Sequence, residues 1–309
     1  MSMHPAIGGI PLVLGGNVFG WTATRDESFA VLDAFYEAGG RMIDTADAYS
    51  AWVEGHQGGE SERVIGEWLE SRGVRGEMLI HTKTGMMGGK ELYEPARVLR
   101  SLDASLERLR TDYLDLYYAH KDYPELPAEE IVEAFDGAVA SGKVRELGAS
   151  NFDAVRLSAT LETADAAGRT PFTVLQNEYN LVSRDSYGDD LQALCTVRGI
   201  AMLPFYGLAS GYLTGKYRTP NDFERGARSG SARAYAEKGA AVLRVMDEIA
   251  AEIGTSLPAL ALAWLVRQPG IPAPIASARN VEQLSDLLEF TRVELSDDQV
   301  ARLTAALPS

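Results

Sequence analysis

Eight short runs rich in aliphatic, aromatic and β-branched residues alternate along this chain with longer segments of helical periodicity. The runs cover residues 11–15, 41–45, 77–83, 113–120, 143–150, 172–178, 200–205 and 271–277. Between them, apolar side chains recur three and four positions apart, which is one face of a helix; an example is Leu99, Leu102, Leu106 and Leu109. Alternating strands and helices predict a parallel sheet covered by helices. With eight such units we expect an α/β fold of the (β/α)8 TIM-barrel type, and a doubly wound sheet is the alternative.

The strand–helix series runs through the chain without a linker rich in proline, glycine or serine. The chain has 309 residues, of which 46% are hydrophobic, so it can bury a large core. Single barrels commonly reach this length, so we expect one domain over residues 1–309. Residues 206–235 break the regular spacing, and their glycine-rich, polar composition is typical of a long functional loop.

The charge and the single cysteine restrict partners and location. A net charge of −15 does not favour binding to nucleic acid or to an anionic membrane. The first basic residue is Arg25, so the N-terminus lacks the basic region of a signal peptide, and its glycines and prolines argue against a membrane span. Cys195, the only cysteine, follows a helical pattern and is predicted to be a core thiol. A chain with no internal disulfide suits a reducing compartment, so we expect a cytoplasmic protein.

Four polar residues stand at or just after the ends of successive predicted strands. Asp44 ends the second run, Lys83 the third and His120 the fourth, and Tyr49 follows the second run in a loop. In a parallel barrel the carboxyl ends of the strands meet at one mouth. Each residue alone could be a helix cap or a solvated charge. As a set on neighbouring strands, they indicate an active site.

The chemistry of this set suits the reduction of a carbonyl group. A free phenol has a pKa near ~10, and a neighbouring ammonium lowers that pKa. We therefore expect Lys83, held by Asp44, to lower the pKa of Tyr49. Tyr49 would protonate a developing alkoxide, and His120 would donate a hydrogen bond to the same oxygen. Such a reaction needs a nicotinamide cofactor for the hydride, but the sequence has no Rossmann glycine fingerprint. The histidines show no metal-binding spacing, so we expect no metal site.

Over nearly its whole length the sequence resembles the aldo-keto reductase superfamily. The resemblance rests on the motifs DTADAYS, GGESERVIGEWL, IHTKTG, SLERLRTDYLDLYYAH, GKVRELGASNF, LQNEYNLV, GYLTGKY and ARNVEQL. It implies a barrel with NADPH extended across its mouth and a small-molecule carbonyl substrate. It also implies that Asp44, Tyr49, Lys83 and His120 form a catalytic tetrad.

The same resemblance assigns cofactor-binding residues. Those expected at the nicotinamide are Ser150, Asn151, Gln176 and Phe205, the last stacking its ring. Those expected at the pyrophosphate are Leu208, Gly211 and Lys216. Those expected at the adenosine end are Ser277, Arg279, Gln283 and Asp286. For Arg279 a surface charge beside a helix is the alternative. The sequence departs from the family pattern at Tyr206 and Gly207, where Ser and Pro are frequent, and at Leu287, which replaces an Asn.

Residues 206–235 suit a flap that admits NADPH and grips its phosphates, and a surface insertion is the alternative. The arginines expected to grip phosphate are Arg225, Arg228 and Arg233. The side chains expected to wall the substrate pocket are Phe19, Trp21, Trp52 and Tyr206. Two functions remain open, an NADPH-dependent reductase of an aldehyde or ketone and an NADPH-binding regulatory or redox-sensing protein on the same fold. The intact tetrad favours the reductase. The substrate, the direction of reaction and the oligomeric state are left open by the sequence.

Overall fold

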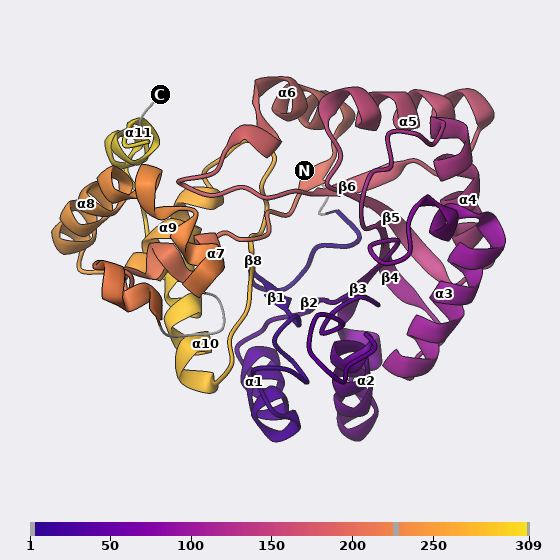
Figure 1. Ribbon diagram of the computed structural model, residues 1–309, viewed down its shortest axis with the longest axis horizontal. Helices are drawn as coiled ribbons and strands as arrows, with labels where there is room; N and C mark the ends of the chain where they lie inside the picture. Colours follow the sequence, from indigo (N-terminus) through magenta and orange to yellow (C-terminus); the bar gives the residue numbers. More distant parts are fainter. Residues whose placement is uncertain (1–3, 225–228, 308–309) are drawn as a thin grey trace.

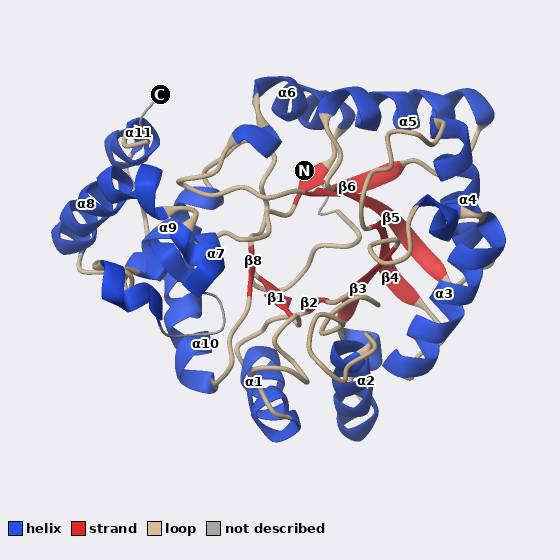
Figure 2. Cartoon of the chain, viewed as in Figure 1, coloured by secondary structure: helices blue, strands red, loops and turns tan. Residues whose placement is uncertain are grey.

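A sheet of eight parallel strands forms the centre of the molecule in the computed structural model, which describes residues 4–224 and 229–307 (Figures 1 and 2). The strands are β1 (Val13–Gly15), β2 (Met42–Asp44), β3 (Leu79–Thr84), β4 (Leu114–Ala119), β5 (Val144–Ser150), β6 (Phe172–Gln176), β7 (Ala201–Met202) and β8 (Ile275–Ala276). Each overlaps one of the eight predicted runs, so the predicted (β/α)8 fold is confirmed.

The sheet curls so that its two edge strands meet. The strand order is β7-β6-β5-β4-β3-β2-β1-β8. The backbone N–H of Ile275 donates to Pro204 O at 2.9 Å, and that of Met202 donates to Gly270 O at 2.8 Å. β7 and β8 are shorter than their predicted runs, which contain prolines such as Pro204 and Pro274. Proline lacks the N–H that a strand ladder requires.

Helices cover the outside of the sheet (Figure 2). Their bounds are α1 (Arg25–Glu37), α2 (Glu60–Arg72), α3 (Pro95–Leu109), α4 (Ala128–Ala140), α5 (Ala154–Ala167), α6 (Asp189–Arg198), α8 (Ala236–Ile253), α9 (Leu257–Leu265), α10 (Val281–Leu288) and α11 (Asp297–Ala305). Leu102, Leu106 and Leu109 are buried on α3, as their spacing predicts. Within the described ranges, no single helix is long and apolar enough to cross a membrane; α8 and α9 meet that test only as a pair, bent by 99°.

The carboxylate of Glu62 on α2 ties two helices to the sheet. It is fully buried and accepts hydrogen bonds from Thr82 Oγ1 on β3 and from Arg108 Nε on α3, both at 2.6 Å. A buried charge is tolerated when it is paired in this way. At Gly66 an added Cβ would lie 2.2 Å from Arg108 O, so α2 and α3 approach closely there. These contacts give part of the GGESERVIGEWL motif an architectural role.

The interior of the barrel is filled by side chains and closed at its amino-terminal end. The buried residues inside it are Ala6, Val13, Met42, Leu116, Tyr118, Val174, Leu203, Ala273 and Ile275. His81 Nε2 on β3 lies 3.0 Å from Ala6 O, which draws the N-terminal segment under the strands. Burial lowers the pKa of His81 to about 4, so the imidazole is neutral at physiological pH.

The segment 206–235, between β7 and α8, contains short helical turns where the sequence suggests a loop. These are η4 (Ala209–Thr214), η5 (Pro220–Glu224) and α7 (Ser229–Arg233). The rings of Tyr217 and Phe223 stack with centroids 4.9 Å apart. Such contacts within the segment are not revealed by its glycine-rich composition.

The arginines of this segment were predicted to grip phosphate, and the one that the structure describes lies away from the cavity. The Arg233 guanidinium lies 5.4 Å from the centre of the Phe223 ring. It is not among the residues that line the cavity described below, so a phosphate-gripping role for it is not supported. Arg225 and Arg228 lie outside the described residues. Arg218, which the sequence does not single out, forms two 2.8 Å hydrogen bonds with Asp247 of α8.

Candidate active site

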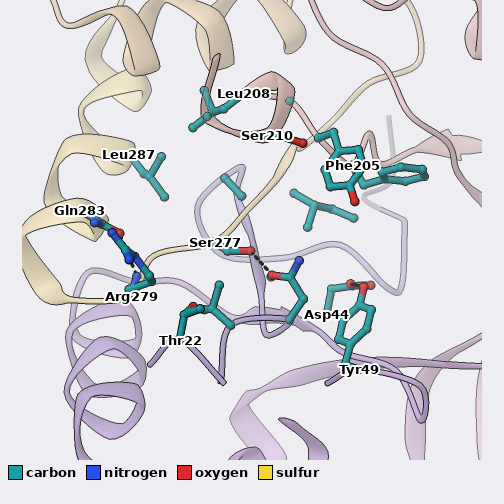
Figure 3. A pocket seen from close by; sticks show the side chains of 18 of the residues that line it. Thr22, Asp44, Tyr49, Phe205, Leu208, Ser210, Ser277, Arg279, Gln283 and Leu287 are labelled. Atoms are coloured by element: carbon teal, nitrogen blue, oxygen red, sulfur yellow. Dashed lines mark hydrogen bonds between the residues drawn. The ribbon is translucent and has the colours of Figure 1, made fainter. Parts of the chain in front are cut away.

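A cavity of about 1060 Å³ opens at the carboxyl ends of the strands. The sequence-predicted residues that line it are Asp44, Tyr49, His120, Ser150, Asn151, Gln176, Phe205, Leu208, Gly211, Lys216, Ser277, Arg279, Gln283 and Asp286. Figure 3 shows Arg279 and Gln283 on the far side of this cavity from Asp44 and Tyr49. Lys83 lies behind the wall and is fully buried. The structure therefore gathers the predicted residues around one space, although they come from the ends of seven different strands, β2 to β8.

Asp44, Lys83 and Tyr49 form one hydrogen-bonded cluster. Lys83 Nζ donates to Asp44 Oδ2 at 2.6 Å, to Thr45 O at 2.8 Å and to the Tyr49 hydroxyl at 2.9 Å. The Tyr49 hydroxyl also lies 3.2 Å from Asp44 Oδ2. β2 and β3 are neighbours, with Asp44 paired to His81, so Lys83 stands two residues further towards the cavity. The ammonium thus has three acceptors, which is what a buried cation requires.

The pKa of Tyr49 differs in direction from the prediction. Burial, followed by the charge and hydrogen bond of Asp44, raises the pKa of Tyr49 well above its usual value. Burial also lowers the pKa of Lys83, against the opposing effect of Asp44. The sequence argument counted the ammonium but not desolvation, nor the carboxylate lying directly against the phenol. Tyr49 is consequently a protonated phenol at neutral pH.

His120 follows β4 and faces the same phenol. Its ring centre lies 6.1 Å from that of Tyr49, at an interplanar angle of 74°. Burial, with a smaller contribution from the charge of Lys83, lowers the pKa of His120 well below its usual value. Its Nδ1 is buried without a hydrogen-bond partner. A buried acceptor is tolerated more readily than a buried donor, so the neutral tautomer protonated at Nε2 is favoured.

Side-chain amides connect the cluster to β5 and β6. Asn151 has a left-handed backbone, with φ of 61°, and its Nδ2 donates to His120 O at 3.0 Å and to Ser150 Oγ at 3.1 Å. Gln176 Nε2 donates to Asp44 Oδ1 at 2.9 Å. Ser150 and Gln176 are partners in the sheet register. All of these side chains reach the wall of the cavity, so they could also bind a polar group placed there.

The opposite wall is formed by the turns that follow β7. The rings of Phe205 and Tyr206 meet edge to face, with centroids 5.1 Å apart. Tyr206 and Ser210 have φ values of 54° and 56°, and Gly211 has 90°. An added Cβ at Gly211 would lie 3.1 Å from Lys216 Nζ, so the Lys216 ammonium lies close to this backbone. A cation beside exposed backbone is suited to binding an anion.

The far end of the cavity follows β8. Ser277 Oγ donates to Asn17 Oδ1 at 2.8 Å. The backbone N–H of Arg279 donates to Gln283 Oε1 at 3.1 Å, which connects two of the predicted residues at the start of α10. In the described part of the chain, Lys216 and Arg279 are the lysine and arginine side chains that line the cavity. The cavity wall after β7 and β8 thus carries two cations, although the chain as a whole is acidic.

Sequence reasoning missed several lining residues and misplaced others. The additional ones include Asn17, Thr22, Met86 and Met87. None of these four residues stands at the end of a predicted strand, so that criterion did not indicate them. Among the predicted pocket walls, Trp52 and Tyr206 do line the cavity. Phe19 is fully buried in the core, and Trp21 instead packs edge to face on Trp52 at 5.4 Å.

Comparison with known proteins gives one consistent result. The model of the aldo/keto reductase family matches residues 11–308. Norsolorinic acid reductase stcV of Emericella nidulans is 34% identical over 96% of this chain and 78% of its own length. The aryl-alcohol dehydrogenase (NADP(+)) of Phanerodontia chrysosporium is 32% identical over 93% of this chain and 77% of its own length. Aldo-keto reductase AMT2 of Alternaria alternata is 30% identical over 94% of this chain and 86% of its own length.

Proposed function

Because the chain belongs to the aldo/keto reductase family, and is therefore an oxidoreductase, we propose that it reduces an aldehyde or ketone to an alcohol with NADPH. The observation that carries this proposal is the position of the Tyr49 hydroxyl. It lies on the cavity wall within hydrogen-bond distance of both Lys83 and Asp44. We also propose a cytoplasmic location, which suits the single buried thiol of Cys195.

Tyr49 acts as the proton donor. Its raised pKa keeps the phenol protonated at neutral pH, which is the form that reduction requires. As the proton leaves for the carbonyl oxygen, Lys83 stabilises the phenolate that remains, and Asp44 keeps the ammonium in place. The neutral imidazole of His120 donates a hydrogen bond from Nε2 to the same oxygen, which orients the carbonyl.

The cavity wall fits NADPH in its chemistry. When bound, the reduced nicotinamide would supply a hydride to the carbonyl carbon and be left as NADP⁺. Its carboxamide would be held by Ser150, Asn151 and Gln176, and its ring would lie against Phe205. Lys216 and Arg279 would neutralise the phosphates, because both cations line the cavity of a chain whose net charge is −15. The remaining residues in the cofactor site are Leu208, Gly211, Ser277, Gln283 and Asp286.

The segment 206–235 would act as a gate for the cofactor. It carries Tyr206, Gly211 and Lys216 on the cavity wall and continues as turns that reach α8. Tyr235, at its end, donates from its hydroxyl to Glu178 Oε1 at 2.7 Å, after β6. Saturating NADPH should slow cleavage of this segment by trypsin. Cleavage at an unchanged rate would remove the gate from the proposal but not the tetrad.

Tyr49→Phe tests the catalytic proposal. Removing a positioned acid typically lowers the rate by about 10²–10⁴-fold. We expect kcat to fall by this factor on a panel of aldehydes and ketones. The Kd of NADPH, measured by quenching of protein fluorescence, should stay within about twofold of wild type, which corresponds to ~0.4 kcal/mol. Tyr113→Phe is the matched control, because Tyr113 precedes β4 at the opposite end of the barrel.

The same measurements separate the reductase from a regulatory protein. A reductase gives repeated turnovers of NADPH with at least one carbonyl in the panel. A wild-type protein that binds NADPH tightly but turns over none of them would favour a regulatory or redox-sensing role. A Phe variant with normal turnover would exclude Tyr49 as the proton donor.

A further inference from the structure

The carboxylate of Asp47 lies behind the cavity wall, two residues before the proposed proton donor. In the described part of the chain, its neighbours Ala48 and Tyr49 line the cavity and Asp47 does not. Asp47 Oδ2 accepts a hydrogen bond of 2.7 Å from Thr84 Oγ1, at the end of β3. The reaction proposed above gives this carboxylate no task, although it stands directly between the loop and the strand that supply the reacting groups.

Two hydrogen bonds of Asp47 tie the loop that carries Tyr49 to β3. The Asp47 backbone N–H donates to Lys83 O at 3.1 Å, and the carboxylate accepts from Thr84, the next residue. Thr84 O in turn accepts a hydrogen bond of 2.9 Å from the backbone N–H of His120. Lys83 Nζ lies 2.9 Å from the Tyr49 hydroxyl. The contacts of Asp47 therefore hold together the two segments that this hydrogen bond connects.

The groups around Asp47 leave much of its negative charge without compensation. Arg108 is the cation that favours the ionised carboxylate, but Arg108 Nε already donates to Glu62 Oε2 at 2.6 Å. The charge of Glu62 opposes ionisation of Asp47. The phenols of Tyr93 and Tyr117 also face Asp47, and burial raises the pKa of both, so they are neutral. The charge of Asp47 can consequently act on more distant groups.

One of these groups is the Lys83 ammonium. Burial lowers the pKa of Lys83, and the charges of Asp44 and then of Asp47 oppose that effect. A negative charge that acts at Lys83 also acts at the Tyr49 hydroxyl, 2.9 Å away. It makes the phenolate formed during reduction less stable, because like charges repel over about 10 Å in a protein interior. Lys83 keeps its charge without Asp47, since its 2.6 Å contact with Asp44 remains.

We propose that Asp47 is a further positioning residue for the reduction: its contact with Thr84 holds Tyr49 against Lys83, and its negative charge slows proton transfer from Tyr49. The proposal rests on the proposed reductase function. Burial raises the pKa of Asp47 to about 6, so the charge is present above this pH and absent below it. Reduction should consequently become faster as the pH falls through about 6. NADPH binding should be unaffected, because Asp47 does not reach the cavity.

Asp47→Asn tests the effect of the charge. Single-turnover oxidation of bound NADPH by a carbonyl compound is followed from pH 8 to pH 5, so that cofactor release does not limit the rate. The wild-type rate should rise by about three- to tenfold, the effect of one distant charge on the barrier. The uncharged variant keeps a hydrogen-bond acceptor, so its rate should equal the wild-type rate at pH 5 throughout. The same rise in the variant as in wild type would overturn the role of the charge.

Asp136→Asn is the matched control for this charge. Asp136 Oδ1 also accepts a hydrogen bond from a threonine, Thr170 Oγ1, at 2.9 Å. Thr170 precedes β6, so this pair lies at the opposite end of the barrel from the cavity. The control variant should keep the wild-type pH profile.

Thr84→Val tests the contact with Asp47. Valine has nearly the shape of threonine but cannot donate the hydrogen bond. The single-turnover rate at pH 8 should fall about tenfold or more, because misplaced reacting groups react slowly. The Kd of NADPH should stay within about twofold of wild type. Thr84→Ser, which keeps the hydroxyl, should restore the rate. An unchanged rate in Thr84→Val would overturn the positioning role, and Thr84→Ala carries the same comparison if the valine variant does not fold.

A spectroscopic measurement separates failure of this role from failure of the reductase function. The NMR signal of Lys83 Cε in protein labelled with ¹³C-lysine, identified by its absence in Lys83→Met, should shift around pH 6 in wild type but not in Asp47→Asn. No turnover of any carbonyl compound, with a shift in wild type alone, would overturn the reductase and retain the link between Asp47 and Lys83. Turnover with equal shifts in both proteins would overturn the link and leave the reductase standing.

Discussion

The two sides of the cavity are built in different ways. On the β2–β4 side, β3 and β4 have six residues each and are paired with both neighbours. The polar groups there are buried and share hydrogen bonds, as Lys83 and Asp44 do. On the β7–β8 side the strands have two residues each, and the wall consists of turns with left-handed residues such as Tyr206 and Ser210.

This difference matches the demands of the two tasks that we propose. Proton transfer needs atoms held within a few tenths of an ångström, and paired strands provide that rigidity. Binding and releasing a cofactor needs a wall that can open, and turns with few strand hydrogen bonds are better suited to it. The comparison predicts that substitutions on the β2–β4 side act strongly on both activity and stability. Substitutions on the β7–β8 side should act mainly on binding.

The largest effect is expected for Lys83→Met. Removing the ammonium leaves Asp44 buried without its main partner, which typically destabilises a protein by about 3–5 kcal/mol. Activity should fall at least as far as in Tyr49→Phe. Urea unfolding measures the first effect and steady-state kinetics the second. The double variant Lys83→Met/Asp44→Asn should recover part of the stability but none of the activity. Recovery of activity would show that the Lys83–Asp44 ion pair is not needed for catalysis.

Asp47→Asn should increase stability in a pH-dependent way. Burial raises the pKa of Asp47 to about 6, above the ~3.9 of an unfolded chain. Between these values the folded state holds a proton that the unfolded state has lost, so the stability of wild type falls as the pH rises through this range. Above this pH range, the ionised and buried Asp47 lowers the free energy of unfolding by at most ~3 kcal/mol, at 1.36 kcal/mol per pKa unit. The Asn variant removes this penalty.

Unfolding by urea at pH values from 4 to 8 checks this prediction. The Asn oxygen can still accept the hydrogen bond that Thr84 Oγ1 gives to Asp47 at 2.7 Å, so that contact is retained. The stability difference between variant and wild type should grow up to about pH 6 to 6.5 and then level off. A difference that is constant over the whole range would show that ionisation of Asp47 is not linked to folding.

Arg279→Ala should weaken NADPH selectively. An arginine fork suits a 2′-phosphate, and loss of one charged hydrogen bond of ~1.5–3 kcal/mol corresponds to about tenfold or more in Kd. NADH, which lacks that phosphate, should bind the variant and wild type about equally. Titrations of both cofactors, followed by fluorescence, measure the ratio. Equal losses of affinity for NADPH and NADH would mean that Arg279 does not bind the 2′-phosphate.

Arg218→Ala should have the smallest effect. Its two hydrogen bonds to Asp247 join the segment 206–235 to α8, but both side chains are 40% exposed or more. Exposed ion pairs contribute about 0–1 kcal/mol, so unfolding by urea should shift by no more than this. Set beside Lys83→Met, this compares an exposed with a buried ion pair in one molecule. A loss as large as that of Lys83→Met would contradict the proposed difference between the two sides.

Much of the fold and of the candidate site could be predicted because the signals are local. Strand runs and helical faces repeat with fixed periods, and Asp44, Lys83 and His120 stand at recognisable strand ends. Asn17 and Met86 have no such signal. Each lines the cavity because a distant segment shapes its loop, as Ser277 does for Asn17 across the β1–β8 pairing. The missing signals were therefore long-range contacts.

The sequence by itself determined the order of strands and helices, the acidic charge and the identity of the polar side chains at the barrel mouth, because these depend on period and composition. The tertiary structure alone decided the electrostatics and the shape of the site. Burial and the contact with Asp44 raise the pKa of Tyr49, and Arg233 lies over the Phe223 ring and is not among the residues that line the cavity. Desolvation and shape arise only when segments far apart in the chain enclose the same volume, and no local pattern carries that information.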